Sequence, residues 1–149
     1  SDWSSDVCFR STAPNKGTLL YGNMDKGSSD ASGATEFISK MLTAVDTLHK
    51  VHLMTTGPGS FAAHEALGDT YSQLEDGLDG LAESWMGCTR QAVAFDGVDT
   101  STYSVEARRI YDYIETNRAM MGPESHIQNL IDDILDKLAR NLFKLDRLA

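Results

Sequence analysis

Apolar residues recur at steps of three and four along the chain from Ala34 onward, which is the spacing of one face of an α-helix. The first stripe ends at the sequence TTGPG, residues 55–59, because Gly and Pro disfavour continuation of a helix. The second stripe keeps its spacing without a miss to Trp85, as expected of a helix packed along its length. The two stripes consist of Phe37, Met41, Val45, Leu48 and His52, then His64, Leu67, Tyr71, Leu74, Leu78, Leu81 and Trp85.

The second half of the chain predicts two more helices. The third covers about residues 102–121 and stops at Gly122-Pro123, and the fourth covers about residues 124–148. Residues 86–101 are interpreted as a connection, and no segment alternates in the manner of a strand. The sequence therefore predicts an all-α protein, an antiparallel four-helix bundle over residues 34–149.

Residues 1–33 differ from the rest of the chain. Residues 12–33 are rich in Gly, Ser, Asn and Asp and show no sustained period, which is typical of a flexible, disordered arm. The first eleven residues, SDWSSDVCFRS, resemble the translation of a sequencing adapter. We therefore predict that residues 1–33 form a disordered or artefactual arm outside the bundle.

Charge and composition narrow the possible partners. The net charge of -9 on 149 residues repels phosphate backbones and favours cations as partners over nucleic acid. No apolar run approaches the roughly 20 residues of a membrane span. Cys8 and Cys88 show no CxxC spacing, so we expect no disulfide framework and a cytoplasmic location. The basic stripe of the fourth helix is better explained as a solvated face than as a DNA-binding face; it consists of Lys137, Arg140, Lys144 and Arg147.

Two histidines flank the TTGPG break. His52 lies five residues before Gly57, and His64 lies five residues after Gly59. In an antiparallel hairpin both would lie roughly 8 Å from the turn. Since both belong to apolar stripes, we expect them to face each other. Two interpretations remain open: each imidazole is a core residue with its own hydrogen-bond partner, or the pair binds a metal ion.

The second helix also carries Asp79 and Glu83, an i,i+4 pair of carboxylates. Asp79 is 15 residues beyond His64, about 22 Å along the helix axis, so one chain cannot bring the carboxylates to the histidines. A second copy running antiparallel would unite the histidines of one chain with the carboxylates of the other. The small residues Gly68 and Ser72 would let that copy approach. Taken alone, the carboxylates are better explained as a solvated acidic face.

Two segments carry a resemblance to a known family. HLMTTGPGSFAAHEAL, residues 52–67, followed by DGLAE, residues 79–83, resembles the Dps miniferritins of the ferritin-like superfamily, in particular their diverged phage-encoded relatives. The resemblance implies a ferritin-like bundle that assembles as a homo-oligomer, a dimer at least and commonly a dodecamer. It also implies that His52 and His64 of one subunit, with Asp79 and Glu83 of another, form an iron-binding ferroxidase site. Fe(II) would be oxidised there by peroxide or dioxygen, and Fe(III) stored inside the shell, in the cytoplasm of a bacterial or phage-infected cell.

Departures from the family pattern leave the enzymatic activity open and argue against DNA binding. Gly68 stands where the family usually has an aspartate, and Leu53 where an aromatic residue often follows the first histidine. The chain also lacks the lysine-rich tail through which many members bind DNA, so DNA binding is not expected. The alternative is a non-catalytic structural or interaction bundle with at most a structural metal site, in which Zn(II) takes the place of iron.

Overall fold

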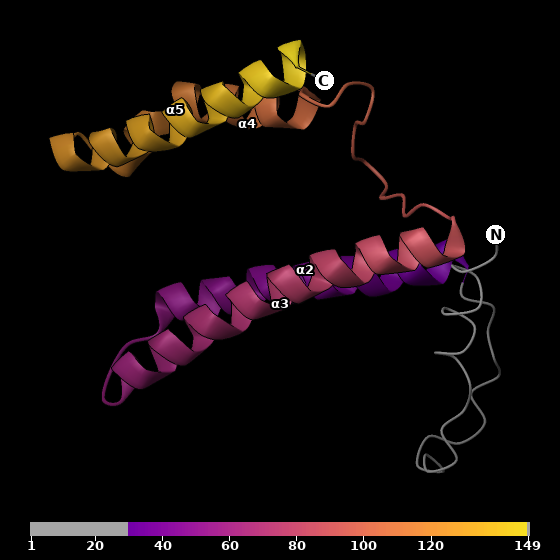
Figure 1. Cartoon of the computed structure of the whole chain (residues 1–149). Helices are drawn as coiled ribbons and strands as arrows, with labels where there is room; N and C mark the ends of the chain where they lie inside the picture. Colours follow the sequence, from indigo (N-terminus) through magenta and orange to yellow (C-terminus); the bar gives the residue numbers. More distant parts are fainter. Residues whose placement is uncertain (1–29, 149) are drawn as a thin grey trace. The chain divides into compact units, whose positions relative to one another are not determined.

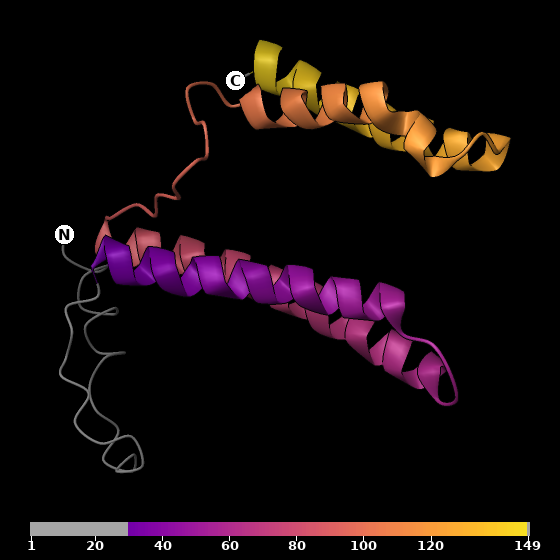
Figure 2. The ribbon, with the colours of Figure 1, turned by 180° about the vertical axis from the view of Figure 1, so that it is seen from behind.

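The computed structural model of the chain describes residues 30–148, and the regular secondary structure in that range is all helical (Figures 1 and 2). Its elements are α2 (Ala31–Met54), α3 (Ser60–Thr89), α4 (Val105–Asn117), the 3-10 helix η1 (Arg118–Met121) and α5 (Ser125–Arg147). The predicted all-α class with four α-helices is therefore confirmed over the described range. Residues 1–29, which include Cys8, lie outside the described residues. The prediction of an arm there, and the expectation about a disulfide between Cys8 and Cys88, fall outside them too.

The first two helices form an antiparallel hairpin, in which α3 runs back along α2 (Figure 1). The turn between them is the predicted TTGPG segment, and Gly57 and Gly59 adopt positive φ values of 95° and 77° there. A side chain would strain the backbone at such angles, so glycine makes the sharp reversal possible. The seam between the helices buries Ile38, Val45 and Leu78.

The start of α2 is set by a local cap rather than by the apolar pattern. The carboxylate of Asp30 accepts a hydrogen bond of 2.7 Å from the backbone N–H of Gly33, and α2 begins at Ala31. The helix therefore includes residues 31–33, which were predicted to belong to the arm, because a capping side chain extends a helix beyond its apolar stripe.

Loss of this cap is expected to destabilise the first hairpin. Asp30→Ala leaves the N–H of Gly33 without its partner, which should lower the free energy of unfolding by about 1 kcal/mol. Urea unfolding followed by circular dichroism measures the change. Ser32→Ala, an exposed substitution in the same turn, is the matched control and should leave the midpoint unchanged. Equal midpoints for Asp30→Ala and Ser32→Ala would contradict the capping role.

The second hairpin consists of α4, η1 and α5, with its core at Ile131, Leu135 and Leu142. The third helix is shorter than predicted: α4 ends at Asn117, and η1 continues to Met121 with tighter 3-10 geometry. Side-chain hydrogen bonds replace the missing α-helical ones. The guanidinium of Arg118 donates to the side-chain and backbone oxygens of Gln128, and the Gln128 amide donates back to the Arg118 carbonyl.

The contacts divide the chain into two units, one up to Phe95 and one from Asp96 onward. Each unit is one helical hairpin, so the predicted packing of all four helices into one ferritin-like bundle stays a prediction. Both hairpins expose large apolar side chains, including Phe37 and Leu42 in the first and Ile110, Ile134 and Phe143 in the second. No helix within residues 30–148 is both long enough and apolar enough to cross a membrane.

Candidate functional site: a histidine pair at the α2–α3 turn

His52 and His64 face each other across the first hairpin, as the sequence predicts. Their imidazole rings stack with centroids 3.6 Å apart and planes inclined by 25°. Each ring also contacts the backbone of the other residue. Nδ1 of His52 lies 2.7 Å from the carbonyl oxygen of His64, and Nδ1 of His64 lies 3.0 Å from that of His52. The two residues thus form a stacked pair, joined by two reciprocal hydrogen bonds, near the turn between α2 and α3.

These hydrogen bonds fix the protons of both rings. A carbonyl oxygen can only accept, so each Nδ1 must carry the hydrogen and donate it. In the neutral ring Nε2 then keeps its lone pair, which is the form in which histidine binds metal ions. A ring N–H bonded to a backbone carbonyl is also the usual orienting contact of metal-bound histidine. Each imidazole thus has a hydrogen-bond partner and keeps a metal-binding nitrogen, but neither is a core residue, because His64 is exposed and His52 is only half-buried.

The spacing of the stack limits how the pair can bind metal. Two imidazoles that share one ion at about 2.1 Å per nitrogen have ring centroids roughly 4.6 to 6.5 Å apart, for N–metal–N angles from 90° to 180°. The centroids of His52 and His64 are only 3.6 Å apart. The two rings therefore cannot bind the same ion in this arrangement, and each imidazole is suited to binding a separate ion.

Gly68 lies directly beside the ring of His52. A Cβ atom added to this glycine would lie 3.3 Å from Cε1 and 3.5 Å from Nδ1 of His52. At Gly77, Gly80 and Gly87, the other glycines of α3, such an atom would meet nothing within 4 Å. Glycine within a helix costs about 0.5–1 kcal/mol relative to alanine. At position 68 the lack of a side chain gives the imidazole its room, and a longer side chain there would reach the edge of the ring.

Two further rings adjoin the pair. From the sequence, Tyr71 is a residue of the second apolar stripe, and His49 is better explained as a surface histidine than as an entry residue of the site. Tyr71 packs edge-on against His52 with centroids 5.5 Å apart and planes at 72°. His49 stacks on Tyr71 at 4.1 Å and 14°. The helical spacing contains the signal, since Tyr71 is seven residues after His64 and His49 three residues before His52, so each lies on the same face as its neighbour.

Asp79 and Glu83 remain apart from the histidines within one chain. Both are exposed, and no cluster of three or more His, Cys, Asp or Glu residues able to hold a metal exists among residues 30–148. This agrees with the expectation that one chain alone cannot assemble the four predicted ligands. Of the four predicted ligands, one chain brings together only the two imidazoles.

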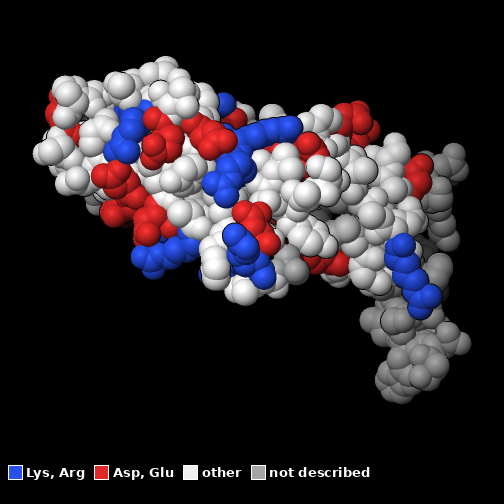
Figure 3. Space-filling model, turned by 90° about the horizontal axis from the view of Figure 1, so that it is seen from above, with Lys and Arg blue, Asp and Glu red and all other residues white. Residues whose placement is uncertain are grey.

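The carboxylates belong to a longer acidic stripe on α3. This helix contains six acidic residues and no Lys or Arg, and none of the six forms an ion pair with the described residues; they are Glu65, Asp69, Glu75, Asp76, Asp79 and Glu83. At 100° per residue, all except Glu75 lie within an arc of about 80°. Elsewhere charges are mixed: on the face shown in Figure 3, Lys and Arg side chains are interspersed with Asp and Glu.

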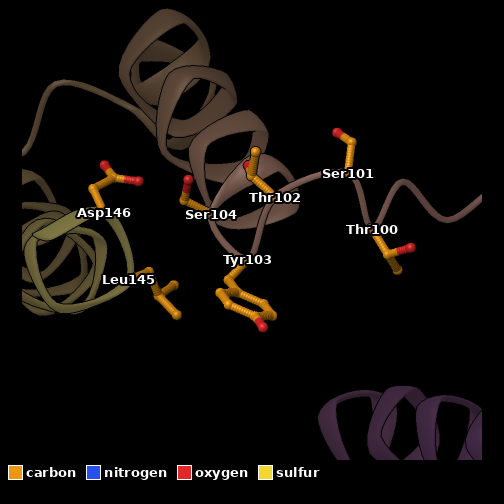
Figure 4. A pocket seen from close by; sticks show the side chains of 7 residues that line it. All are labelled: Thr100, Ser101, Thr102, Tyr103, Ser104, Leu145 and Asp146. Carbon is orange, nitrogen blue, oxygen red and sulfur yellow. The ribbon is translucent and has the colours of Figure 1, made fainter. Parts of the chain in front are cut away.

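A hollow in the second hairpin has a different chemistry. It has a volume of about 530 Å³ and is lined by residues 100–104 together with Leu145 and Asp146 (Figure 4). Five of its seven lining residues carry a hydroxyl group, and none of the seven is one of the four predicted site residues. The histidine pair therefore remains the candidate for metal chemistry.

Fold and site together define a class: an all-helical protein whose first hairpin carries a preorganised imidazole pair. Comparison with known families places the chain more closely. It belongs to a family of unknown function, DUF5856, whose match covers residues 52–145. The matched segment begins at His52, includes all four predicted site residues and extends into both hairpins. Searches of curated proteins and of solved structures find no significant match.

Proposed function

We propose that this chain is a subunit of a miniferritin-like cytoplasmic oligomer that oxidises Fe(II) and stores Fe(III). The observation that carries the proposal is the reciprocal pair of His52 and His64, whose Nδ1–H groups are bound to carbonyls and whose Nε2 atoms are left to bind metal. Imidazole nitrogen with carboxylate oxygen is a ligand set that suits iron. Asp79 and Glu83 of a partner subunit would supply the oxygen ligands.

A two-fold axis through the middle of α3 would bring these groups together. Ser72 lies halfway between His64 and the Asp79–Glu83 pair, and at 100° per residue all four lie within an arc of about 100° on the helix. Ser72 is small and exposed. A second α3 crossing antiparallel at Ser72 would therefore place His64 of one subunit beside the carboxylates of the other, twice per dimer.

The arrangement suits a site with two iron ions. The close stack gives each imidazole its own ion, and the carboxylates can stabilise the Fe(III) product because their oxygens are hard ligands. Two Fe(II) ions each give one electron to one peroxide molecule, whose O–O bond breaks. The peroxide takes up two protons and leaves as two water molecules. Iron is thus the substrate and cargo, and the chain's part is to hold two ions near one oxidant.

The exposed apolar side chains support the ferritin-like bundle within this proposal. A helical hairpin has too little internal contact to cover an apolar stripe on its outer faces, and Phe37 in the first hairpin and Phe143 in the second are both more than half exposed. Packing the two hairpins into one four-helix bundle would cover such residues.

Iron binding and oxidation on one sample test the proposal. Fe(II) is added to the chain without oxygen and binding is measured, then peroxide or dioxygen is added while Fe(III) absorbance and particle size are followed. We expect binding, oxidation faster than in buffer, and a soluble ferric core in a particle much larger than one chain. Oxidation no faster than in buffer would exclude the ferroxidase function.

One observation favours a second candidate, a structural metal site. Gly68 supplies no ligand beside His52, where a carboxylate would have strengthened the site. With fewer ligands, an imidazole of the pair could hold Zn(II) together with Asp79 and Glu83 of a partner, and the ion would link the subunits of a non-catalytic bundle. Stoichiometric metal binding that leaves Fe(II) unoxidised, with loss of the oligomer on chelation, would establish this function instead.

A further inference from the structure

We infer that His49 and His52 form a second cation site, which captures a divalent ion from solvent and passes it to the histidine pair. The inference rests on the proposed function, because it concerns how metal reaches that site. It assigns a role to two side chains, His49 and Tyr71, that neither of the candidate functions uses.

The distance between the two rings fits a shared ion. The centroids of His49 and His52 are 6.1 Å apart and their planes are inclined by 60°. This separation lies within the range of roughly 4.6 to 6.5 Å for two imidazoles on one ion, whereas the 3.6 Å stack of His52 on His64 does not. His52 thus has two neighbouring imidazoles, and only His49 is placed to share an ion with it.

The ring of His49 is exposed yet held in place. It stacks on Tyr71, and Tyr71 in turn meets His52 edge-on, so one aromatic ring contacts both imidazoles from across the seam. Neither ring nitrogen of His49 hydrogen-bonds to any residue in the described part of the chain, in contrast to Nδ1 of His52 and of His64. An exposed imidazole that is held in place by stacking, with both nitrogens free of hydrogen bonds to the protein, loses little conformational entropy on binding an ion.

The direction of transfer follows from exposure and ligand number. In one chain His49 and His64 are both exposed and His52 is half-buried, but the partner helix of the proposed dimer would lie over His64. The site of His49 and His52 offers two imidazoles from one helix. The proposed site between subunits combines an imidazole with two carboxylates of a partner subunit and therefore holds the ion more firmly. An ion would therefore bind first where access is greatest and move to the site with more ligands.

Rapid mixing of the metal-free full chain with Co(II) tests this inference through the visible absorption of bound cobalt. We expect His49→Ala to take up Co(II) several-fold more slowly, with the same final number of ions per chain. His126→Ala, which removes an exposed histidine of the other hairpin, is the matched control and should bind at the wild-type rate. Tyr71→Ala should slow uptake like His49→Ala, whereas Tyr71→Phe, which keeps the stacked ring, should restore it.

Each other outcome has a distinct meaning. An unchanged uptake rate in His49→Ala would overturn the inference. A loss of bound Co(II) in His49→Ala as large as in His52→Ala would also overturn it, because His49 would then be a ligand of the final site. Absence of Co(II) binding by the wild-type chain would overturn both the inference and the proposed function. Slow uptake in His49→Ala together with no Fe(II) oxidation by the wild type would uphold the inference and remove the ferroxidase proposal alone.

Discussion

A mixture of His52→Ala and Asp79→Ala chains is expected to oxidise Fe(II) at about a quarter of the wild-type rate, although neither variant oxidises it alone. The reason lies in the geometry of one chain, where Asp79 cannot reach the histidines of its own hairpin. Each shared site takes histidines from one subunit and carboxylates from the other. In a mixed dimer, one site combines both substitutions and the other has neither. Random association makes half the dimers mixed, so about one site in four is intact.

Intact sites form only in dimers that contain one chain of each variant. The two variants are therefore mixed in equal amounts, denatured together and refolded. The chain carrying both substitutions is the control, and it should stay inactive when refolded by itself. Glu36→Ala, which removes an exposed carboxylate of α2, should keep the wild-type rate. No recovery in a mixture that forms normal oligomers would contradict the shared site. Oxidation by either variant alone at the wild-type rate would exclude that residue as a ligand.

Gly68→Asp is expected to strengthen Fe(II) binding roughly tenfold or more, an effect comparable to that of other groups which tune a metal site. The first side-chain atom at this position would lie 3.3 Å from Cε1 of His52, the carbon next to the metal-binding Nε2. A carboxylate one bond further out can therefore reach an ion on this imidazole. It would add a hard oxygen ligand from the same chain, and it should speed oxidation for the same reason.

Two control variants distinguish the effect of the carboxylate charge from the effects of the added Cβ atom and of side-chain shape. Gly68→Ala adds only the Cβ atom, so it shows what the shift of the His52 ring by a few tenths of an ångström costs in affinity. Gly68→Asn has nearly the shape of aspartate without its charge. Titration with Fe(II) in the absence of oxygen gives the dissociation constant of each. If aspartate binds no more tightly than asparagine, no ion sits on His52 within reach of position 68.

The two helical hairpins differ in how far the sequence determines them. The apolar stripes of α2, α3 and α5 are long and regular, so their helices follow from local spacing, to within three residues at Ala31, four at Thr89 and one at Ser125. The end of α4 at Asn117 does not, because Arg118 and Gln128 bond across the turn and replace the helical pattern there. Such side-chain bonds between separate segments leave no periodic trace in the sequence.

The candidate site likewise has features that follow from the sequence and features that depend on how the helices pack. The matched height of His52 and His64 along the two helices follows from the sequence, because a fixed rise per residue and a turn at TTGPG leave no other register. The packing of α2 against α3 is needed to see that the rings stack and that each Nδ1 atom bonds to the carbonyl of the other histidine. It also places Gly68, Tyr71 and His49 around the two rings. Those contacts depend on how α2 and α3 are rotated about their axes where they pack. That rotation is set by the side chains of the whole seam acting together, whereas spacing along one helix is set by the backbone alone.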